Sequence, residues 1–368
     1  LVMVSPAQAS QFAAGDYVLL IQMQGVGIQT AQGSYGVNVQ SLIGNPGAYE
    51  FLQLLSVNGG TGEIRFTRNV YINSYSITGN VQLIRVPFYN HPVVTSTLSA
   101  QPWNSSTGTG GVVAIMAGRK LTLNAGIDVT GQGFAGAPGV PGTGECVSTN
   151  VAANSLDSYN LSWNNAGLKG EGVAIHDLNG VLLYPGHAKG QGRNFTGGGG
   201  GNGRYSGGGG GSNRGKGADG GIENALLCST DPRDGGYGGM NIFGSIIQDG
   251  VFLGGGAGAS TQATGSTASA GGSGGGIVFI IADSIDGNNQ ILRADGVTAL
   301  NSVSDAGAGG GGAGGSIVLS FQGFSSELTL SANGGNGGMS PGGSGEGGGG
   351  GGGLIWFSTS STPSSVSG

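Results

Sequence analysis

Short runs of apolar residues alternate with turn signals over residues 1–100, and no stretch there keeps the 3.6-residue spacing of a helix. Turns are marked by Asn58-Gly59-Gly60 and by Thr78-Gly79-Asn80, residue types that favour tight reversals of the backbone. We therefore expect residues 1–100 to form a small all-β domain, a β-sandwich or a barrel. The predicted strands are 17–23 (YVLLIQM), 51–57 (FLQLLSV), 63–67 (EIRFT) and 81–86 (VQLIRV).

A repeated pattern begins near Gly108, where the glycine content of the chain rises. Each copy opens on a glycine pair and continues through an apolar stretch, a short turn, a second stretch and a corner of small residues. From the second glycine of the pair to the closing glycine, the three complete copies span 20, 20 and 19 residues, and a fourth copy opens near position 352. The complete copies open with Gly110-Gly111 before VVAIMA, Gly275-Gly276 before IVFIIA and Gly314-Gly315 before SIVLSF.

These stretches predict strands that are buried on both faces, because they are apolar at nearly every position rather than at every second one. One copy cannot bury its own surface, whereas several stacked copies can. We therefore expect residues 101–368 to form a glycine-rich repeat β domain, β-solenoid-like or layered, with an irregular insertion at about 140–195. The open fourth copy suggests a domain that continues beyond the C-terminus.

Four glycine runs punctuate this domain, and two interpretations of them are open. The first is a set of flexible linkers, the usual behaviour of glycine-rich sequence. The second is ordered polyglycine in the polyproline-II conformation, whose segments approach closely and hydrogen-bond to one another. We favour ordered packing, because the runs punctuate a repeat whose strands need fixed neighbours. The runs are 197–201, 207–211, 309–312 and 347–353.

Composition narrows the possible functions. Glycine supplies 85 of 368 residues and charged residues only 9%, yet 37% of the chain is hydrophobic, enough for a buried core. The net charge is −6 and the 13 basic residues are scattered, which argues against nucleic-acid binding. No apolar run is long enough for a transmembrane helix. Leu1 opens the chain without a charged leader, so we expect its export signals to lie outside it.

Metal and cofactor chemistry has little support. His91, His176 and His187 are isolated in loop-like sequence, without the spacing of a zinc or metalloprotease motif. We therefore expect no cofactor. Calcium is the alternative left open, since Asp231 and Asp234 could hold an ion opportunistically, but the chain lacks the repeated motif of calcium-binding β-helices.

A glycan-cleaving active site would need two carboxylates that face one cleft. Asp286 and Asp295 lie in corners of the repeat (IDGNN and ADG), where aspartate favours tight turns. We therefore expect no catalytic residue and no enzymatic activity. The full cluster is Asp283, Asp286, Asp295 and Asp305.

Cys146 and Cys228 form a candidate disulfide, with two free buried thiols as the alternative.

The insertion at about 140–195 is the region where we expect ligand recognition. Loops that project from a rigid scaffold commonly carry binding residues. Tyr159, Trp163 and Tyr184 are therefore the aromatic side chains that we expect to contact a ligand such as a glycan.

Several segments together resemble a known group of proteins. The specific ones are the opening FAAGDYVLLIQMQG at 12–25, VQLIRVPFYN at 81–90 and the Trp103 segment QPWNSSTGTGGVVAIMAG. Later glycine-rich segments such as SGGGIVFIIADSIDGN follow in matching order. On these motifs the chain resembles long glycine-rich, adhesin-like cell-surface proteins of Bacteroidota, of the gliding-motility-associated type secreted by the type IX system.

The resemblance implies an extracellular location at the bacterial cell surface and export by the type IX machinery of the outer membrane. It supplies no catalytic residues. We expect a non-catalytic structural or adhesive module of a large secreted protein, with self-association into a filament or surface layer, or with other cell-surface proteins as partners. The alternative is a glycan-binding or glycan-cleaving β-solenoid. An ice-binding or phage-tip module is a third hypothesis, disfavoured by the long glycine-poor N-terminal part.

Overall fold

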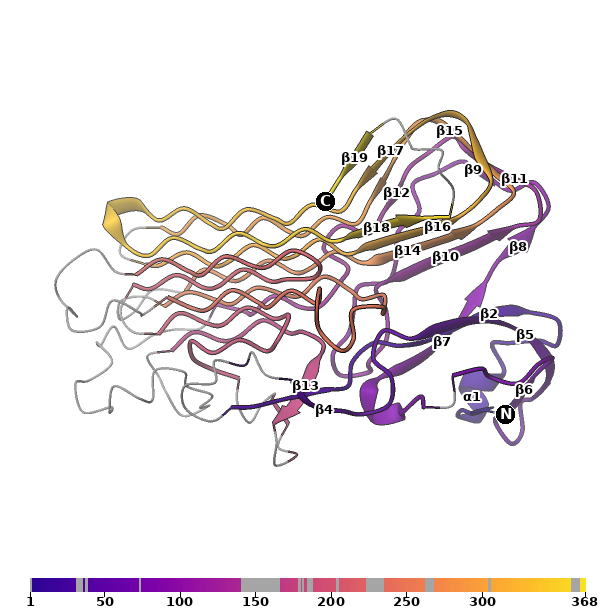
Figure 1. Cartoon of the computed structure of the whole chain (residues 1–368), viewed down its shortest axis with the longest axis horizontal. Helices are drawn as coiled ribbons and strands as arrows, with labels where there is room; N and C mark the ends of the chain where they lie inside the picture. Colours follow the sequence, from indigo (N-terminus) through magenta and orange to yellow (C-terminus); the bar gives the residue numbers. More distant parts are fainter. Residues whose placement is uncertain are drawn as a thin grey trace.

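In a computed structural model of the chain β-strands dominate, and the one α-helix among the described residues, α1 (Pro6–Ala9), is a single turn (Figure 1). The predicted all-β class is confirmed. The structure describes residues 2–30, 36, 39–72, 74–139, 166–177, 180, 182–183, 188–202, 205–222, 235–261, 268–303, 306–358 and 365–368.

The N-terminal part contains a five-stranded antiparallel sheet in the order β1-β6-β5-β2-β7. All four strands predicted for residues 1–100 are present in it, and β5 starts two residues earlier than expected. The predicted turn before β7 contains Asn80 with a φ of 56°, a backbone conformation that asparagine tolerates. The strands are β1 (Val2–Met3), β2 (Tyr17–Gln22), β5 (Tyr49–Asn58), β6 (Glu63–Phe66) and β7 (Val81–Val86).

A second group of strands forms two parallel sheets, and the chain alternates between them from β8 to β11 and again from β14 to β19. In the first sheet Val112 pairs with Ile277, Ile277 with Ser316 and Ser316 with Leu354, so the openings of the four sequence copies share one register. Its order is β18 (Leu354–Phe357), β16 (Ser316–Ser320), β14 (Ile277–Ile281), β10 (Val112–Ala117) and β8 (Phe88–Tyr89). The second has β19 (Ser365–Ser367), β17 (Gly323–Ser331), β15 (Ser284–Arg293), β11 (Lys120–Leu123) and β9 (Val93–Val94), and β12 (Ile127–Asp128) also pairs with β15.

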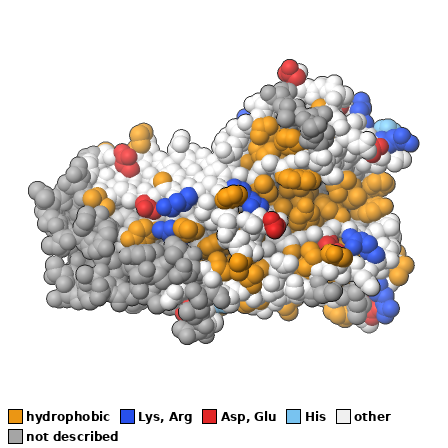
Figure 2. Space-filling view, in the orientation of Figure 1, with side chains coloured by type: hydrophobic (Ala, Val, Ile, Leu, Met, Phe, Trp, Pro, Cys, Tyr) orange, Lys and Arg blue, Asp and Glu red, His pale blue; other side chains and the backbone are white. Residues whose placement is uncertain are grey.

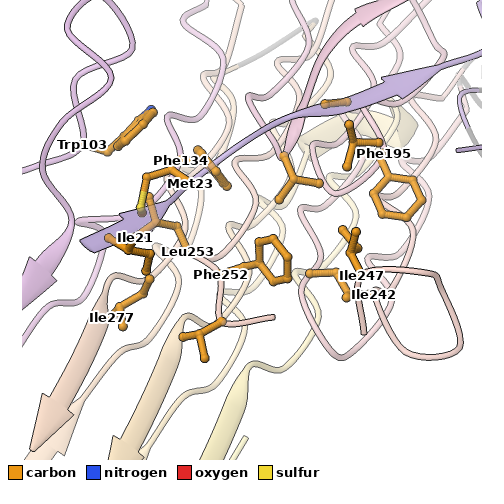
Figure 3. Close-up of a cluster of buried hydrophobic side chains, with 14 of the residues drawn as sticks. Ile21, Met23, Trp103, Phe134, Phe195, Ile242, Ile247, Phe252, Leu253 and Ile277 are labelled. Carbon is orange, nitrogen blue, oxygen red and sulfur yellow. The ribbon is translucent and has the colours of Figure 1, made fainter. Parts of the chain in front are cut away.

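The two faces of β14 lie in different hydrophobic cores. Val278 and Ile280 point into a core between the two parallel sheets, whereas Ile277 and Phe279 point toward the N-terminal sheet. The Phe279 ring lies 4.7 Å from the Tyr49 ring and 5.6 Å from the Phe51 ring. Figure 3 shows this second core, in which side chains of β2 and β14 meet those of the loop around Phe252. Burial on both faces explains the unbroken apolar run of β14.

The two parts of the chain also share strands. β8 and β9 precede residue 100, yet they pair with β10 and β11 of the parallel sheets. A small three-stranded sheet likewise joins β3 (Val26–Ile28) and β4 (Val39–Leu42) to β13 (Ala174–Asp177). The division into domains at residue 100 stays a prediction, and these pairings show how closely the two parts are connected.

Candidate functional site

The glycine-rich segments lie side by side in an extended bundle that runs in line with the parallel strands (Figure 1). We call this set, residues 134–137, 167–171, 196–201, 207–212, 217–221, 235–239, 254–261, 271–276, 294–299, 307–315, 332–338 and 345–353, the glycine bundle. In Figure 2 its visible face is mostly backbone and uncharged side chains, in keeping with the low charge of the chain. The bundle is the largest regular feature of the structure that is not a β-sheet.

Segment 207–212 lies at the centre of six neighbouring segments. Each of its six N–H groups donates to a neighbour's carbonyl and each of its six carbonyls accepts from a neighbour's N–H, with donor–acceptor distances of 2.8–3.0 Å. Partners recur every third residue, so three neighbours accept and three donate. The acceptors are 218–221, 308–311 and 196–199, and the donors are 236–239, 348–351 and 255–258.

At the glycines of segment 207–212, the spacing within the bundle leaves no room for a side chain. A Cβ atom at Gly209 would lie 2.3 Å from the Tyr237 carbonyl oxygen, and one at Gly208 would lie 2.0 Å from the Gly258 carbonyl oxygen. Neither glycine has a positive φ, so the requirement for glycine there comes from the closeness of neighbouring backbones. At these two positions the neighbouring backbone therefore accounts for the choice of glycine.

Buried polar side chains complete the hydrogen bonding at the edges of the bundle. The Lys169 ammonium donates to the carbonyls of Gly190 and Gly192, and the Asn213 amide donates to the Gly314 carbonyl at 2.9 Å. Both side chains are buried. The sequence analysis did not predict these roles.

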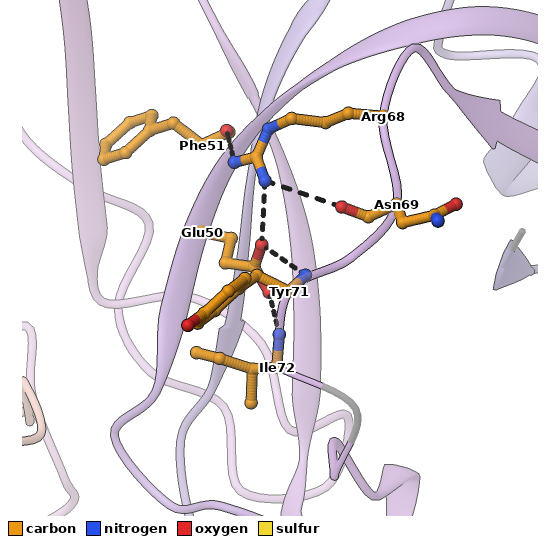
Figure 4. A network of polar contacts seen from close by, with 6 residues as sticks. All are labelled: Glu50, Phe51, Arg68, Asn69, Tyr71 and Ile72. Carbon is orange, nitrogen blue, oxygen red and sulfur yellow. Dashed lines mark hydrogen bonds and ion pairs between the residues drawn. The ribbon is translucent and has the colours of Figure 1, made fainter.

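A buried carboxylate organises one loop of the N-terminal part (Figure 4). Glu50, on β5, is 7% exposed and accepts hydrogen bonds from the backbone N–H groups of Tyr71 at 2.9 Å and Ile72 at 2.8 Å. Arg68 lies 3.4 Å from the same carboxylate and donates to the Phe51 carbonyl at 3.0 Å. These bonds hold the 68–72 loop against the sheet.

That loop borders a shallow groove on the surface. Tyr71, which is 85% exposed, lines this groove together with Arg65, Arg68 and Leu55. Arg65 also pairs with Glu63. An exposed aromatic ring next to guanidinium groups can stack on and hydrogen-bond to a polar ligand. The sequence analysis did not single out these residues.

A second buried carboxylate lies where the N-terminal part meets the bundle. The Trp103 indole N–H donates to Glu171 Oε1 at 2.8 Å, and Gln24 and the Ala135 N–H contribute longer bonds of 3.4 and 3.3 Å. Burial raises the pKa of Glu171 above its usual 4.5, and these hydrogen bonds oppose that shift. These hydrogen bonds to the one Glu171 carboxylate connect the chain segments that contain Trp103, Ala135 and Glu171.

All five residues proposed for the disulfide and for ligand contact lie outside the described part of the chain, and so do His187, Asp231, Asp234 and Asp305. The disulfide and the ligand contacts therefore stay predictions. They are Cys146, Cys228, Tyr159, Trp163 and Tyr184.

Three of the described candidate residues, His176, Asp286 and Asp295, take part in hydrogen bonds. His91 is exposed, and His176 Nδ1 lies 2.7 Å from the Asp177 carbonyl oxygen. Hydrogen bonds from Ser326 and Lys120 lower the pKa of the Asp286 carboxyl. Asp295 accepts from the Ser331 hydroxyl at 2.6 Å and from the Asn333 N–H at 2.7 Å, which ties adjacent copies of the repeat together.

Within the described ranges, no group of three or more His, Cys, Asp or Glu side chains is placed to hold a metal ion. No helix among these residues is long and apolar enough to cross a membrane. Comparison with protein families, curated proteins and solved structures finds no match to the chain.

Proposed function

We propose that the chain is a non-catalytic structural module of a large secreted protein, a rigid extracellular scaffold at the bacterial cell surface. The observation that carries this proposal is the glycine bundle, in which segment 207–212 uses all its backbone groups on six neighbours. Such packing resists bending and leaves no loose chain for a protease. It also presents little charge to its surroundings, which suits a scaffold that works outside the cell.

In architectural terms, we propose a β-solenoid whose coils run on into packed polyglycine of the polyproline-II type. Two features support this. Strands alternate between two parallel sheets in a register that repeats from copy to copy, and hydrogen-bond partners in the bundle recur with the three-residue period of polyproline II. Ordering costs about 1–2 kcal/mol per residue. One net hydrogen bond per residue, at about 1 kcal/mol, together with close packing, offsets most of that cost.

The extracellular location, the type IX export route and cell-surface partners rest on the family resemblance, and we propose them on that basis. Glycan binding is the second candidate function, which the groove beside Tyr71 favours, since exposed aromatic and guanidinium groups are suited to sugar rings and acidic substituents. Neither this groove nor the smaller one between Tyr49 and Ile246 is lined by two carboxylates, so we do not propose glycan cleavage.

Limited proteolysis tests the scaffold proposal. The folded chain is treated with proteinase K and the early cuts are mapped by mass spectrometry. Because the bundle segments are hydrogen-bonded and buried, we expect 207–212 and 307–314 to survive in the largest resistant fragments. First cuts inside these two segments would show that they are linkers and would contradict the proposal.

A further inference from the structure

The last segment of the glycine bundle differs from its inner copy. Residues 307–315 lead into β16 and are buried at every position, whereas residues 345–353 lead into β18 and only Gly345, Gly348 and Gly351 are buried. The two segments correspond position by position, because Ser316 pairs with Leu354 in the sheet that follows. One side of segment 345–353 is therefore open where the inner copy is covered.

The open side carries two rows of backbone groups that have no hydrogen-bond partner among the described residues. The N–H groups of Glu346 and Gly349 make no hydrogen bond to any described residue, and neither do the carbonyl groups of Gly347 and Gly350. Within each row the groups are three residues apart, the spacing at which partners recur throughout the bundle. An exposed edge strand of a β-sheet presents a similar regular row of unpaired N–H and C=O groups, which can pair with another segment.

The inner copy shows what these rows bind. The positions that match 346 and 349 are 308 and 311, whose N–H groups donate to the carbonyls of residues 345 and 348, both at 2.9 Å. The positions that match 347 and 350 are 309 and 312, whose carbonyls accept from the N–H groups of residues 338 and 335 at 3.0 and 2.8 Å. In both rows the partner belongs to the next copy of the repeat.

The sheet edge beside this segment is open in the same direction. Val318, on β16, is 6% exposed, whereas its partner Trp356, on the outermost strand β18, is 48% exposed. Apolar side chains gather over this sheet in Figure 2. The open bundle face thus continues into an open strand, just as each glycine lead continues into its strand.

We propose that this combined face, residues 345–357, binds one further coil of the same chemistry: a glycine run followed by an apolar strand. The matching face of a second copy does not fit, because a two-fold arrangement would set N–H rows against N–H rows. The incoming coil must instead present carbonyl groups to Glu346 and Gly349. This inference rests on the proposed scaffold function and identifies the surface through which the scaffold would be extended.

A peptide with the sequence of residues 306–320 (AGAGGGGAGGSIVLS) is the probe, titrated into the ¹⁵N-labelled chain. Gly349→Val is the blocking variant, since the nearest atom to a Cβ there, the Gly335 carbonyl oxygen, is 4.0 Å away and the fold can accept the side chain. Gly59→Val is the matched control, because nothing lies within 4 Å of that Cβ and the site is a turn of the N-terminal part.

We expect saturable binding, with shifts of the Glu346 and Gly349 amide signals. We also expect affinity to fall at least about tenfold in Gly349→Val and to be unchanged in Gly59→Val. Absence of binding by the original chain, or equal binding by Gly349→Val, would overturn the inference. Amide exchange at 208 and 211 is measured on the same samples. Slow exchange there without peptide binding would contradict only this inference, whereas fast exchange would contradict the proposed scaffold as well.

Discussion

At residue scale, the glycines of the bundle are required by what faces them. A Cβ at Gly209 would meet the Tyr237 carbonyl oxygen at 2.3 Å, and backbone atoms cannot move aside as a flexible side chain can. Gly349 is a glycine of the same bundle whose Cβ position is open. Two residues that look identical in a polyglycine run therefore differ in how well they tolerate substitution.

We predict that Gly209→Val lowers the free energy of unfolding by about 3 kcal/mol or more, since overpacking costs about 1–3 kcal/mol even where neighbours can relax. Gly349→Val, the matched control, should change it by less than about 0.5 kcal/mol. Urea denaturation followed by intrinsic fluorescence measures both. Equal stability of the two variants would mean that Gly209 has no close neighbour.

Glu171 gives the structure a predictable dependence on pH. Because burial raises its pKa in the folded state, the folded chain binds this proton more tightly than the unfolded chain does. The stabilising contribution is therefore fully present below the unfolded pKa of about 4.5 and is lost as the pH rises through the folded pKa.

We expect the free energy of unfolding to fall by up to about 1.4 kcal/mol per pH unit in that window, measured as urea midpoints between pH 4.5 and neutrality. Glu171→Gln should lack this component, and Glu63→Gln, which removes a surface carboxylate, should keep it. An identical pH profile for the original chain and Glu171→Gln would show that the Glu171 carboxyl titrates normally.

At the scale of elements, the strands were predictable where side chains leave a pattern. The continuous apolar runs of β2 and β14 correctly indicated strands, and both bury two faces: in β2, Val18 and Leu20 point to one core and Leu19 and Ile21 to another. The strands that follow the aligned glycine pairs, β10, β14, β16 and β18, pair in one register.

Other elements left no such pattern. Segment 207–212 has no periodic side chain from which its six neighbours could be inferred, and those neighbours lie as far along the chain as 348–351. Glu50 sits in an alternating strand, where a carboxylate ordinarily faces solvent, and only the folded 68–72 loop shows why it is buried. Partners that depend on backbone groups alone have to be found in three dimensions.

At the scale of the whole molecule, the parallel sheets and the glycine bundle form one continuous body. The glycine leads 271–276, 307–315 and 345–353 run directly into β14, β16 and β18, so each coil contributes to both layers (Figure 1). The N-terminal sheet covers one flank through the contacts of Phe279. This continuity is the basis for proposing a rigid scaffold, because bending the bundle would also disturb the sheets.

Residue-resolved amide hydrogen exchange of the glycine segments tests this account most directly. We predict slow exchange at every position of 207–212. In 345–353 we predict slow exchange at Gly345, Gly348 and Gly351 and fast exchange at Glu346 and Gly349, whose N–H groups make no hydrogen bond to a described residue. Fast exchange at all of these positions would show that the runs are flexible linkers and would contradict the account.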